Sequence, residues 1–233
     1  MNLTNESSTA NQKGFLLDLI IYLSVMFLIR EVYFEDLHFI ANGLMWSSST
    51  LIVAMWRMKV RNISWKDLGL RKPENLLKTF LVTVGILAAI PVGIMIFKIT
   101  QDFLPFTLAP DMSSENAASK FGDLKGNWIH FFTIIPFVLI QSTLEELLDR
   151  GFLITWFERL FSSTTFATVI AVLAQAMIFG FRHSYDLSER SVTVGIIGLV
   201  MGIAYVKFGR NLWPLIIAHC VLNTISMAGR VMD

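Results

Sequence analysis

Charged residues and cysteines are scarce in this chain. Only 16% of its 233 residues are Asp, Glu, Lys or Arg, whereas 54% are hydrophobic. So little polar surface cannot cover a soluble domain of this length, and the composition therefore indicates a membrane protein. The single cysteine, Cys220, excludes an internal disulfide and a cysteine-based metal site. The 19 basic and 18 acidic residues nearly balance, so no global positive charge points to nucleic acid as a partner.

Long uncharged apolar runs dominate the rest of the sequence. A helix needs about 20 residues to cross the hydrocarbon core of a bilayer. Seven runs approach that length, and a shorter apolar stretch at 151–157 follows the fourth. The predicted spans are 15–29, 37–56, 79–97, 126–144, 160–181, 191–206 and 211–229. We expect one domain over 1–233, an all-α polytopic transmembrane bundle.

Basic residues collect between the second and third predicted spans. The segment 57–78 holds seven of them, and loops of this kind usually face the cytoplasm. With seven spans, this orientation places the N-terminus in the cytoplasm and the C-terminus outside. We therefore expect a multi-pass protein of the cell membrane.

The first group of polar residues within the apolar helices is Glu145, Glu146 and Arg150. An ionisable side chain that faces lipid costs at least ~2.5 kcal/mol, so these side chains should face a protein interior or a wet cavity. Glu146 and Arg150 are four residues apart, the spacing at which a carboxylate and a guanidinium meet on a helix. Glu145 lies about 100° round the helix and is free to act as a base.

Two further pairs show the same four-residue spacing, Phe179 with His183 and His219 with Asn223. Each cluster alone has an ordinary explanation in helix packing. Two histidines, a free carboxylate and a carboxamide from three helices could together hold a water, accept its proton and donate hydrogen bonds to an oxyanion. That is the minimum set for hydrolysing an amide bond without a covalent intermediate. The expected architecture is thus a bundle with an intramembrane catalytic cavity.

The order EExxxR, FxxxH, HxxxN, each motif in a separate apolar helix, resembles the CPBP family. This family includes the CAAX prenyl endopeptidases of the Rce1 type and bacterial Abi and bacteriocin-processing relatives. The family-like core covers about 126–229, with the spans in 15–99 as accessory elements. The resemblance implies an intramembrane endopeptidase that acts on a hydrophobic or lipidated peptide in the membrane.

The resemblance also implies residue roles. Glu145 would be the general base, His183 would help to hold the water, and His219 and Asn223 would line the oxyanion side. Glu146 and Arg150 would be a supporting pair, and Phe179 completes the second motif. Family members have been described both as metal-dependent and as metal-free glutamate proteases. A divalent metal such as zinc, held by Glu145, His183 and His219, therefore stays open beside a metal-free site.

Two features depart from the simplest arrangement. Asp149 stands where the family often has an aromatic residue, so an additional carboxylate could compete with Glu146 for Arg150. The second is depth: His219 lies about 12 Å into its predicted span, whereas His183 lies about 27 Å from a start near Thr165. For the motifs to meet, the fifth span must begin deeper, tilt or extend further, or the stretch 151–160 must re-enter the membrane.

A rival interpretation needs no catalysis. The same polar cluster could belong to an immunity or regulatory binding protein, or to a small proton- or ion-coupled transporter. The two readings differ in geometry. Hydrolysis requires Glu145, His183 and His219 around one common point, whereas separation by more than about 10 Å would favour the rival, since one water cannot bridge it.

Overall fold

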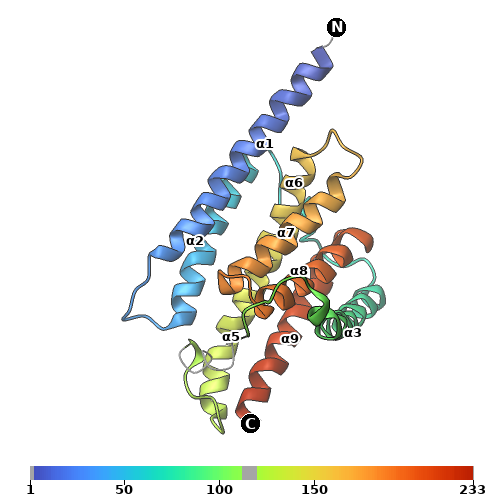
Figure 1. Ribbon diagram of the computed structural model, residues 1–233. Coiled ribbons are helices and arrows are strands. Elements are labelled where there is room, and N and C mark those ends of the chain that lie inside the picture. Colours follow the sequence, from blue (N-terminus) through green and yellow to red (C-terminus); the bar gives the residue numbers. More distant parts are fainter. Residues whose placement is uncertain (1–2, 112–119, 233) are drawn as a thin grey trace.

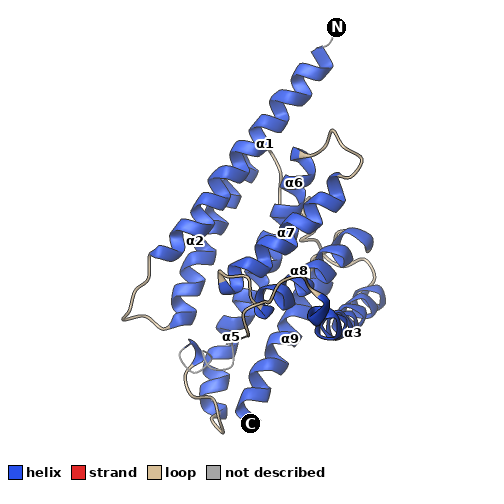
Figure 2. Cartoon of the chain, viewed as in Figure 1, coloured by secondary structure: helices blue, strands red, loops and turns tan. Residues whose placement is uncertain are grey.

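The chain folds as an all-α bundle. The computed structural model describes residues 3–111 and 120–232, and this part of the chain contains helices and loops but no strand (Figure 2). Seven of its helical segments are long and apolar enough to cross a membrane, which confirms the predicted architecture. The segments are α1 (Leu3–Leu28) with the 3-10 turn η1 (Ile29–Glu31), α2 (Phe39–Val60), α3 (Leu76–Thr100) with η2 (Gln101–Phe103), α5 (Trp128–Glu145) continuing through η3 (Glu146–Leu153) into α6 (Ile154–Leu160), α7 (Ala167–Ser184), α8 (Glu189–Lys207) and α9 (Trp213–Met232).

The polarity of the bundle is the reverse of that of a soluble protein. Large apolar side chains point outward, such as Ile52 at 68% and Ile129 at 83% exposed. Several charged and amide side chains are instead buried, among them Asp18, Asn42 and Arg150. An apolar exterior of this extent suits contact with lipid, and the buried polar groups must find their partners inside the protein.

The fourth span is longer than the sequence predicted. It runs without a break from Trp128 to Leu160, and its middle part, η3, is a π-helix. The stretch 151–157 therefore continues the fourth span and does not re-enter the membrane. The fifth span begins at Ala167 rather than at 160, because α6 ends at Leu160 and a polar connection of serines and threonines follows.

Two groups of helices surround the fourth span (Figure 1). α1 packs on α2 and α6, and α2 also packs on α5, whereas α3 packs on α8 and α9. The closest approach is between α7 and α8. A Cβ atom added at Gly180 would lie 2.3 Å from the backbone oxygen of Ser191, so only glycine fits this crossing.

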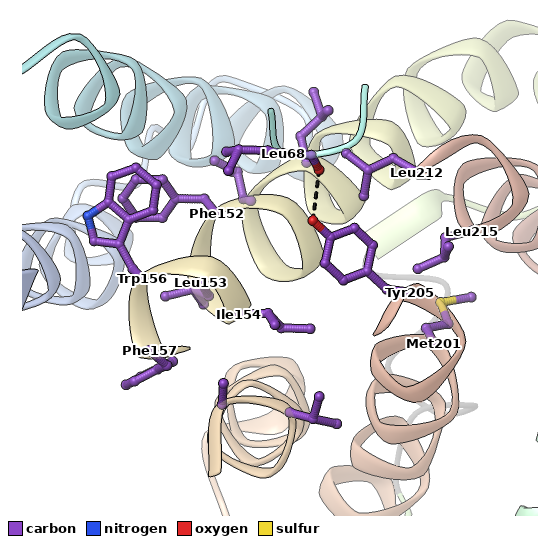
Figure 3. Close-up of a cluster of buried hydrophobic side chains, with 14 of the residues drawn as sticks. Leu68, Phe152, Leu153, Ile154, Trp156, Phe157, Met201, Tyr205, Leu212 and Leu215 are labelled. Carbon is purple, nitrogen blue, oxygen red and sulfur yellow. Dashed lines mark hydrogen bonds between the residues drawn. The ribbon is translucent and has the colours of Figure 1, made fainter. Parts of the chain in front are cut away.

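A buried apolar core holds the π-helical segment in place (Figure 3). Phe152 of η3 stacks on Trp156 of α6 with ring centroids 4.0 Å apart. The Tyr205 hydroxyl of α8 donates a hydrogen bond of 2.9 Å to the backbone oxygen of Leu68, which ties the loop after α2 to the same core. Because tight packing fixes side chains on every side, the carboxylates that η3 carries have little freedom to move.

The first span is joined to this core by a buried ion pair. Asp18 of α1 accepts hydrogen bonds from Arg57 at 2.8 Å and Arg61 at 2.7 Å, both near the end of α2. It also accepts one of 3.1 Å from the Trp156 indole of α6. Asp18, which appeared in the sequence as an interruption of an apolar run, therefore joins α1 to two neighbouring helices.

The depth problem is solved by a stagger between α7 and α9. His183 lies about 24 Å from the start of α7 at Ala167, and His219 lies only about 9 Å from the start of α9 at Trp213. α7 ends one residue after His183, whereas α9 continues to Met232. In Figure 1, α7 begins near the top of the view beside α6 and α9 runs to the bottom, where the C-terminus lies. The two motifs meet because the helices are displaced along their axes.

Candidate active site

Three side chains from three spans converge on one point. Glu145 is the last residue of α5, His183 lies in the last turn of α7, and His219 lies in the second turn of α9. The Glu145 Oε2 atom is 4.0 Å from His183 Nε2 and 3.7 Å from His219 Nε2. These separations are too long for direct hydrogen bonds and are of the size that one water can bridge. The geometry meets the criterion that the sequence set for a hydrolytic centre.

Hydrogen bonds on the far side of each imidazole fix how the ring is turned. His183 Nδ1 lies 2.7 Å from the backbone oxygen of Phe179, which can only accept, so Nδ1–H is the donor. His219 Nδ1 lies 2.7 Å from Glu146 Oε1, and a carboxylate there again favours a proton on Nδ1. Both rings therefore present their Nε2 atoms to Glu145.

Glu146 has two partners. Its Oε1 is 3.1 Å from Arg150 Nη1, and both side chains are fully buried, so the expected ion pair is confirmed. The Arg150 guanidinium also lies 4.2 Å from the centre of the Phe179 ring, a cation–π contact between the first and second motifs. The bond from Glu146 to His219 was not predicted, and it links the first motif to the third.

The change from α-helix to π-helix occurs between the two glutamates, which the sequence did not reveal. Glu145 ends α5 and Glu146 begins η3. Adjacent residues on a helix point in different directions, yet both carboxylates here contact the same imidazole of His219. π-helical turns are rare and occur frequently at functional sites.

The second oxygen of Glu145 is held by a residue that sequence reasoning missed. Gln141 Nε2 lies 3.1 Å from Glu145 Oε1 and 2.7 Å from the Ser47 hydroxyl of α2. The available signal was the position of Gln141 four residues before Glu145 in an otherwise apolar helix. The partner on α2 could not be read from spacing.

Asn223 lies beside the same stretch of α5. Its Nδ2 donates a hydrogen bond of 2.7 Å to the Ser142 hydroxyl, which in turn donates to the backbone oxygen of Val138 at 2.8 Å. One of the two Nδ2 hydrogens is therefore engaged, and Asn223 also lines a cavity that Glu145 reaches.

Asp149 does not compete for Arg150 as the sequence suggested. Its Oδ2 instead forms an ion pair of 2.8 Å with Arg182 Nη2 of α7, and the Asp149 side chain is fully buried. The Arg182 side chain is only 13% exposed, so it does not reach out to the membrane surface. The carboxylate that departs from the usual motif thus has its own cation on the neighbouring span.

A cavity of about 770 Å³ opens beside Glu145. Apolar side chains of α2, α3, α8 and α9 form most of its wall, for example Ile40, Ile94, Ile197 and Leu222. Volume and lining are those of a pocket for a ligand that is largely apolar. The first three spans contribute to this wall as much as the last ones do.

The described residues do not offer a ready metal site. Within residues 3–111 and 120–232, no group of three or more His, Cys, Asp or Glu side chains is placed to hold a metal ion. Metal–ligand bonds are close to 2 Å, so a divalent metal held by Glu145, His183 and His219 would draw their donor atoms somewhat nearer together than the present 3.7 and 4.0 Å.

Comparison with known proteins relates the C-terminal part of the chain to a family. Residues 127–225 match the family model described as Type II CAAX prenyl endopeptidase Rce1-like. All three motifs lie inside this range, and the match confirms the resemblance that they carry. No curated protein and no solved structure matches the chain.

Proposed function

Since residues 127–225 form an Rce1-like domain within a seven-span membrane protein, we propose that the chain is a CAAX-type intramembrane endopeptidase in which Glu145 activates the hydrolytic water. One observation carries the proposal, namely that Glu145 Oε2 lies within 4.0 Å of both His183 Nε2 and His219 Nε2. One water could then bridge this carboxylate to the two imidazoles, which come from three separate helices.

The hydrogen-bonding directions suit attack by that water. The His183 Nδ1–H is engaged with Phe179, so its Nε2 offers a lone pair. A water can donate one hydrogen to His183 Nε2 and the other to Glu145 Oε2, which leaves its own lone pair to attack a carbonyl carbon. Glu145 takes the proton as the new C–O bond forms, and then delivers it to the leaving amide nitrogen as the C–N bond breaks.

The charge of the buried cluster supports a different role for His219. Three carboxylates and two guanidiniums meet here, which leaves one negative charge uncompensated. These groups are Glu145, Glu146, Asp149, Arg150 and Arg182. We infer that a proton on His219 neutralises the cluster. His219 then donates from Nδ1 to Glu146 and from Nε2 to the oxyanion, and Asn223 supplies a second donor.

The cavity indicates the class of substrate. Its apolar wall would accept the hydrophobic side chains or the lipid group of a membrane-associated peptide, with the scissile bond beside Glu145. A prenylated substrate rests on the family description alone. A binding protein or transporter would have no need for two imidazole Nε2 atoms aimed at one carboxylate, and this feature favours the enzyme.

The proposal is tested by comparing membranes from cells that produce the wild type or Glu145→Gln. Peptides with new C-termini are identified by mass spectrometry in each. Glu74→Gln, which changes an exposed loop carboxylate, is the matched control. We expect cleavage products with the wild type and the control that are absent with Glu145→Gln. The same products from all three strains would refute the proposal.

A further inference from the structure

The end of the cavity nearest the C-terminus of α9 is ringed by positive charge. Arg30, Arg190 and Arg230 all line the cavity. Each lies within two residues of the end of a membrane span, in η1, at the start of α8 and at the end of α9. Lys120 Nζ lies 5.6 Å from the centre of the Phe39 ring, which lines the cavity, and the charges of all three arginines act on it. We call these four residues the basic mouth.

The basic mouth has no balancing carboxylate pairs. Among the residues that the structure describes, none of its four cations forms an ion pair with Asp or Glu. Arg190 Nε is buried without a hydrogen-bond partner. Burial, together with the charges of Arg190, Arg30 and Arg230, holds the pKa of Lys120 below its usual range, and Asp111 opposes this only in part. Like charges gathered in this way repel one another until an anion joins them.

Arg30 does not simply reach out to the surface. The Arg30 guanidinium lies 4.1 Å from the centre of the Tyr185 ring, and its Nη1 donates to the backbone oxygen of Arg182 at 3.3 Å. Tyr185 and Arg182 are themselves residues of the cavity wall. Arg30 is thereby held toward the cavity, whereas a snorkelling arginine would extend along the helix into water.

The wall next to the basic mouth is apolar. Ile90, Ile94 and Met95 of α3 face it from one side, and Ile40 of α2 faces it from another. A ligand that satisfies both parts must carry an anionic group at one end and a hydrocarbon chain at the other. Residues at the ends of spans lie at the depth of lipid headgroups, where phosphate is the abundant anion.

We propose that the basic mouth binds the phosphate of an anionic phospholipid, with an acyl chain in the apolar part of the cavity. Arginine suits this ligand because its planar guanidinium can pair with two phosphate oxygens at once. Several cations that converge from η1, α8 and α9 match a phosphate better than the single carboxylate at the end of a peptide. The acyl chain would lie on the same apolar wall that the proposed function gives to the substrate, so the lipid and a substrate would compete, but lipid binding itself does not require peptidase activity.

Lipid binding to the purified full-length protein in neutral detergent tests it. Native mass spectrometry measures binding of phosphatidylglycerol and of phosphatidylcholine with the same chains. We expect one tightly bound phosphatidylglycerol, weakened more than about tenfold in Arg30→Gln/Arg190→Gln/Arg230→Gln. The control, Lys59→Gln/Lys66→Gln/Lys72→Gln, removes three exposed charges at the other end of the bundle and should bind as the wild type does.

Three results would overturn the proposal. The first is equal binding of the two lipids, and the second is unchanged binding of phosphatidylglycerol to the arginine variant. The third is full competition by inorganic phosphate, which would indicate a site for a soluble anion. The corresponding triple Arg→Lys variant keeps the charge and guards against misfolding, since we expect it to retain most of the preference for phosphatidylglycerol. A different result would make the mouth a site for the substrate. In that case the triple Arg→Gln variant would still bind lipid, and its KM would rise for a peptide substrate with a free C-terminal carboxylate but not for the same peptide with a C-terminal amide.

Discussion

Two adjacent carboxylates have different partners here, which suits the different roles proposed for them. Glu146 is fully buried and shares its Oε1 between Arg150 and the Nδ1 of His219. One oxygen of Glu145 accepts a hydrogen bond from the Gln141 amide. The other oxygen faces two imidazole Nε2 atoms at distances that one water can bridge. The contacts of Glu146 therefore orient Arg150 and His219, whereas Glu145 Oε2 has a free lone pair that can accept a proton.

Asn223 gives a test of the oxyanion side. In Asn223→Ala, kcat should fall by about 10²–10³, the usual cost of removing one oxyanion donor, with little change in KM. Ser226→Ala is the control, because Ser226 lines the same cavity from the same helix. Steady-state kinetics on an identified substrate make the measurement, and a variant with wild-type kcat would remove Asn223 from the mechanism.

Treatment with a chelator separates a water-based site from a metal-based one. Because the described side chains form no metal-binding group, we expect turnover of the purified protein to survive treatment with a strong chelator and dialysis. Elemental analysis of the same sample provides the comparison. Loss of activity together with one equivalent of zinc, restored when zinc is returned, would contradict the mechanism.

The sequence predicted a contact within one helix but not the contacts between helices. Spacing placed Glu146 beside Arg150, since both lie on one helix. It could not show that Glu146 reaches His219, that Gln141 reaches Ser47 or that Asp149 pairs with Arg182, because contacts between helices depend on their rotation and displacement.

At the scale of the elements, the π-helical segment and α7 are joined by the pair of Asp149 and Arg182. The 2.8 Å contact lies one residue before Arg150 in η3 and one residue before His183 in α7. It holds α7, which carries His183, in register with the π-helical segment that directly follows Glu145.

A double-mutant cycle measures that link. Asp149→Leu should lower the free energy of unfolding by about 3–5 kcal/mol, because it leaves Arg182 buried without its carboxylate. Asp149→Leu/Arg182→Met should recover most of this loss, since an apolar pair replaces the ions. Denaturant titration in detergent provides the values.

The exposed pair of Lys98 and Glu189 serves as the comparison for that cycle, with Lys98 45% exposed. Glu189→Gln should cost no more than about 1 kcal/mol. If Asp149→Leu were equally mild, the buried pair would not link the segments.

Element boundaries were predicted less well than element types. The spans were recognisable because each is a long apolar run, whereas the division between the fourth and fifth spans was not. A serine- and threonine-rich turn follows Leu160 before α7 starts at Ala167. Because apolar residues flank this turn on both sides, the sequence reads as one continuous apolar run. The stagger of α7 against α9 was likewise invisible, because an apolar run does not specify depth.

At the scale of the whole molecule, the two groups of basic residues lie at opposite ends of the bundle, and the cavity lies between them. The loop between α2 and α3 carries the basic residues of one end, the cavity and Glu145 lie in the interior, and the basic mouth lies at the other end. α2 contributes Ser47 to the hydrogen bonds around Glu145, and α3 contributes Ile94 to the cavity wall.

The orientation in the membrane is testable with single cysteines. In a Cys220→Ala background, Lys125→Cys should react with a membrane-impermeant maleimide on intact cells. Lys66→Cys should react only after the membrane is opened, because the basic loop is expected in the cytoplasm. Both positions are exposed in the fold, so accessibility depends on the side of the membrane. The opposite labelling pattern would reverse the topology.

The most direct measurement of the central claim is turnover by purified protein in lipid vesicles, on a substrate identified from the membrane comparison. Wild type, Glu145→Gln and Glu74→Gln are assayed side by side, with folding checked by thermal unfolding. The mechanism predicts that Glu74→Gln cleaves at the wild-type rate. It also predicts that Glu145→Gln remains folded and that its kcat is lower by a factor of about 10²–10⁴. Wild-type turnover by folded Glu145→Gln would contradict it.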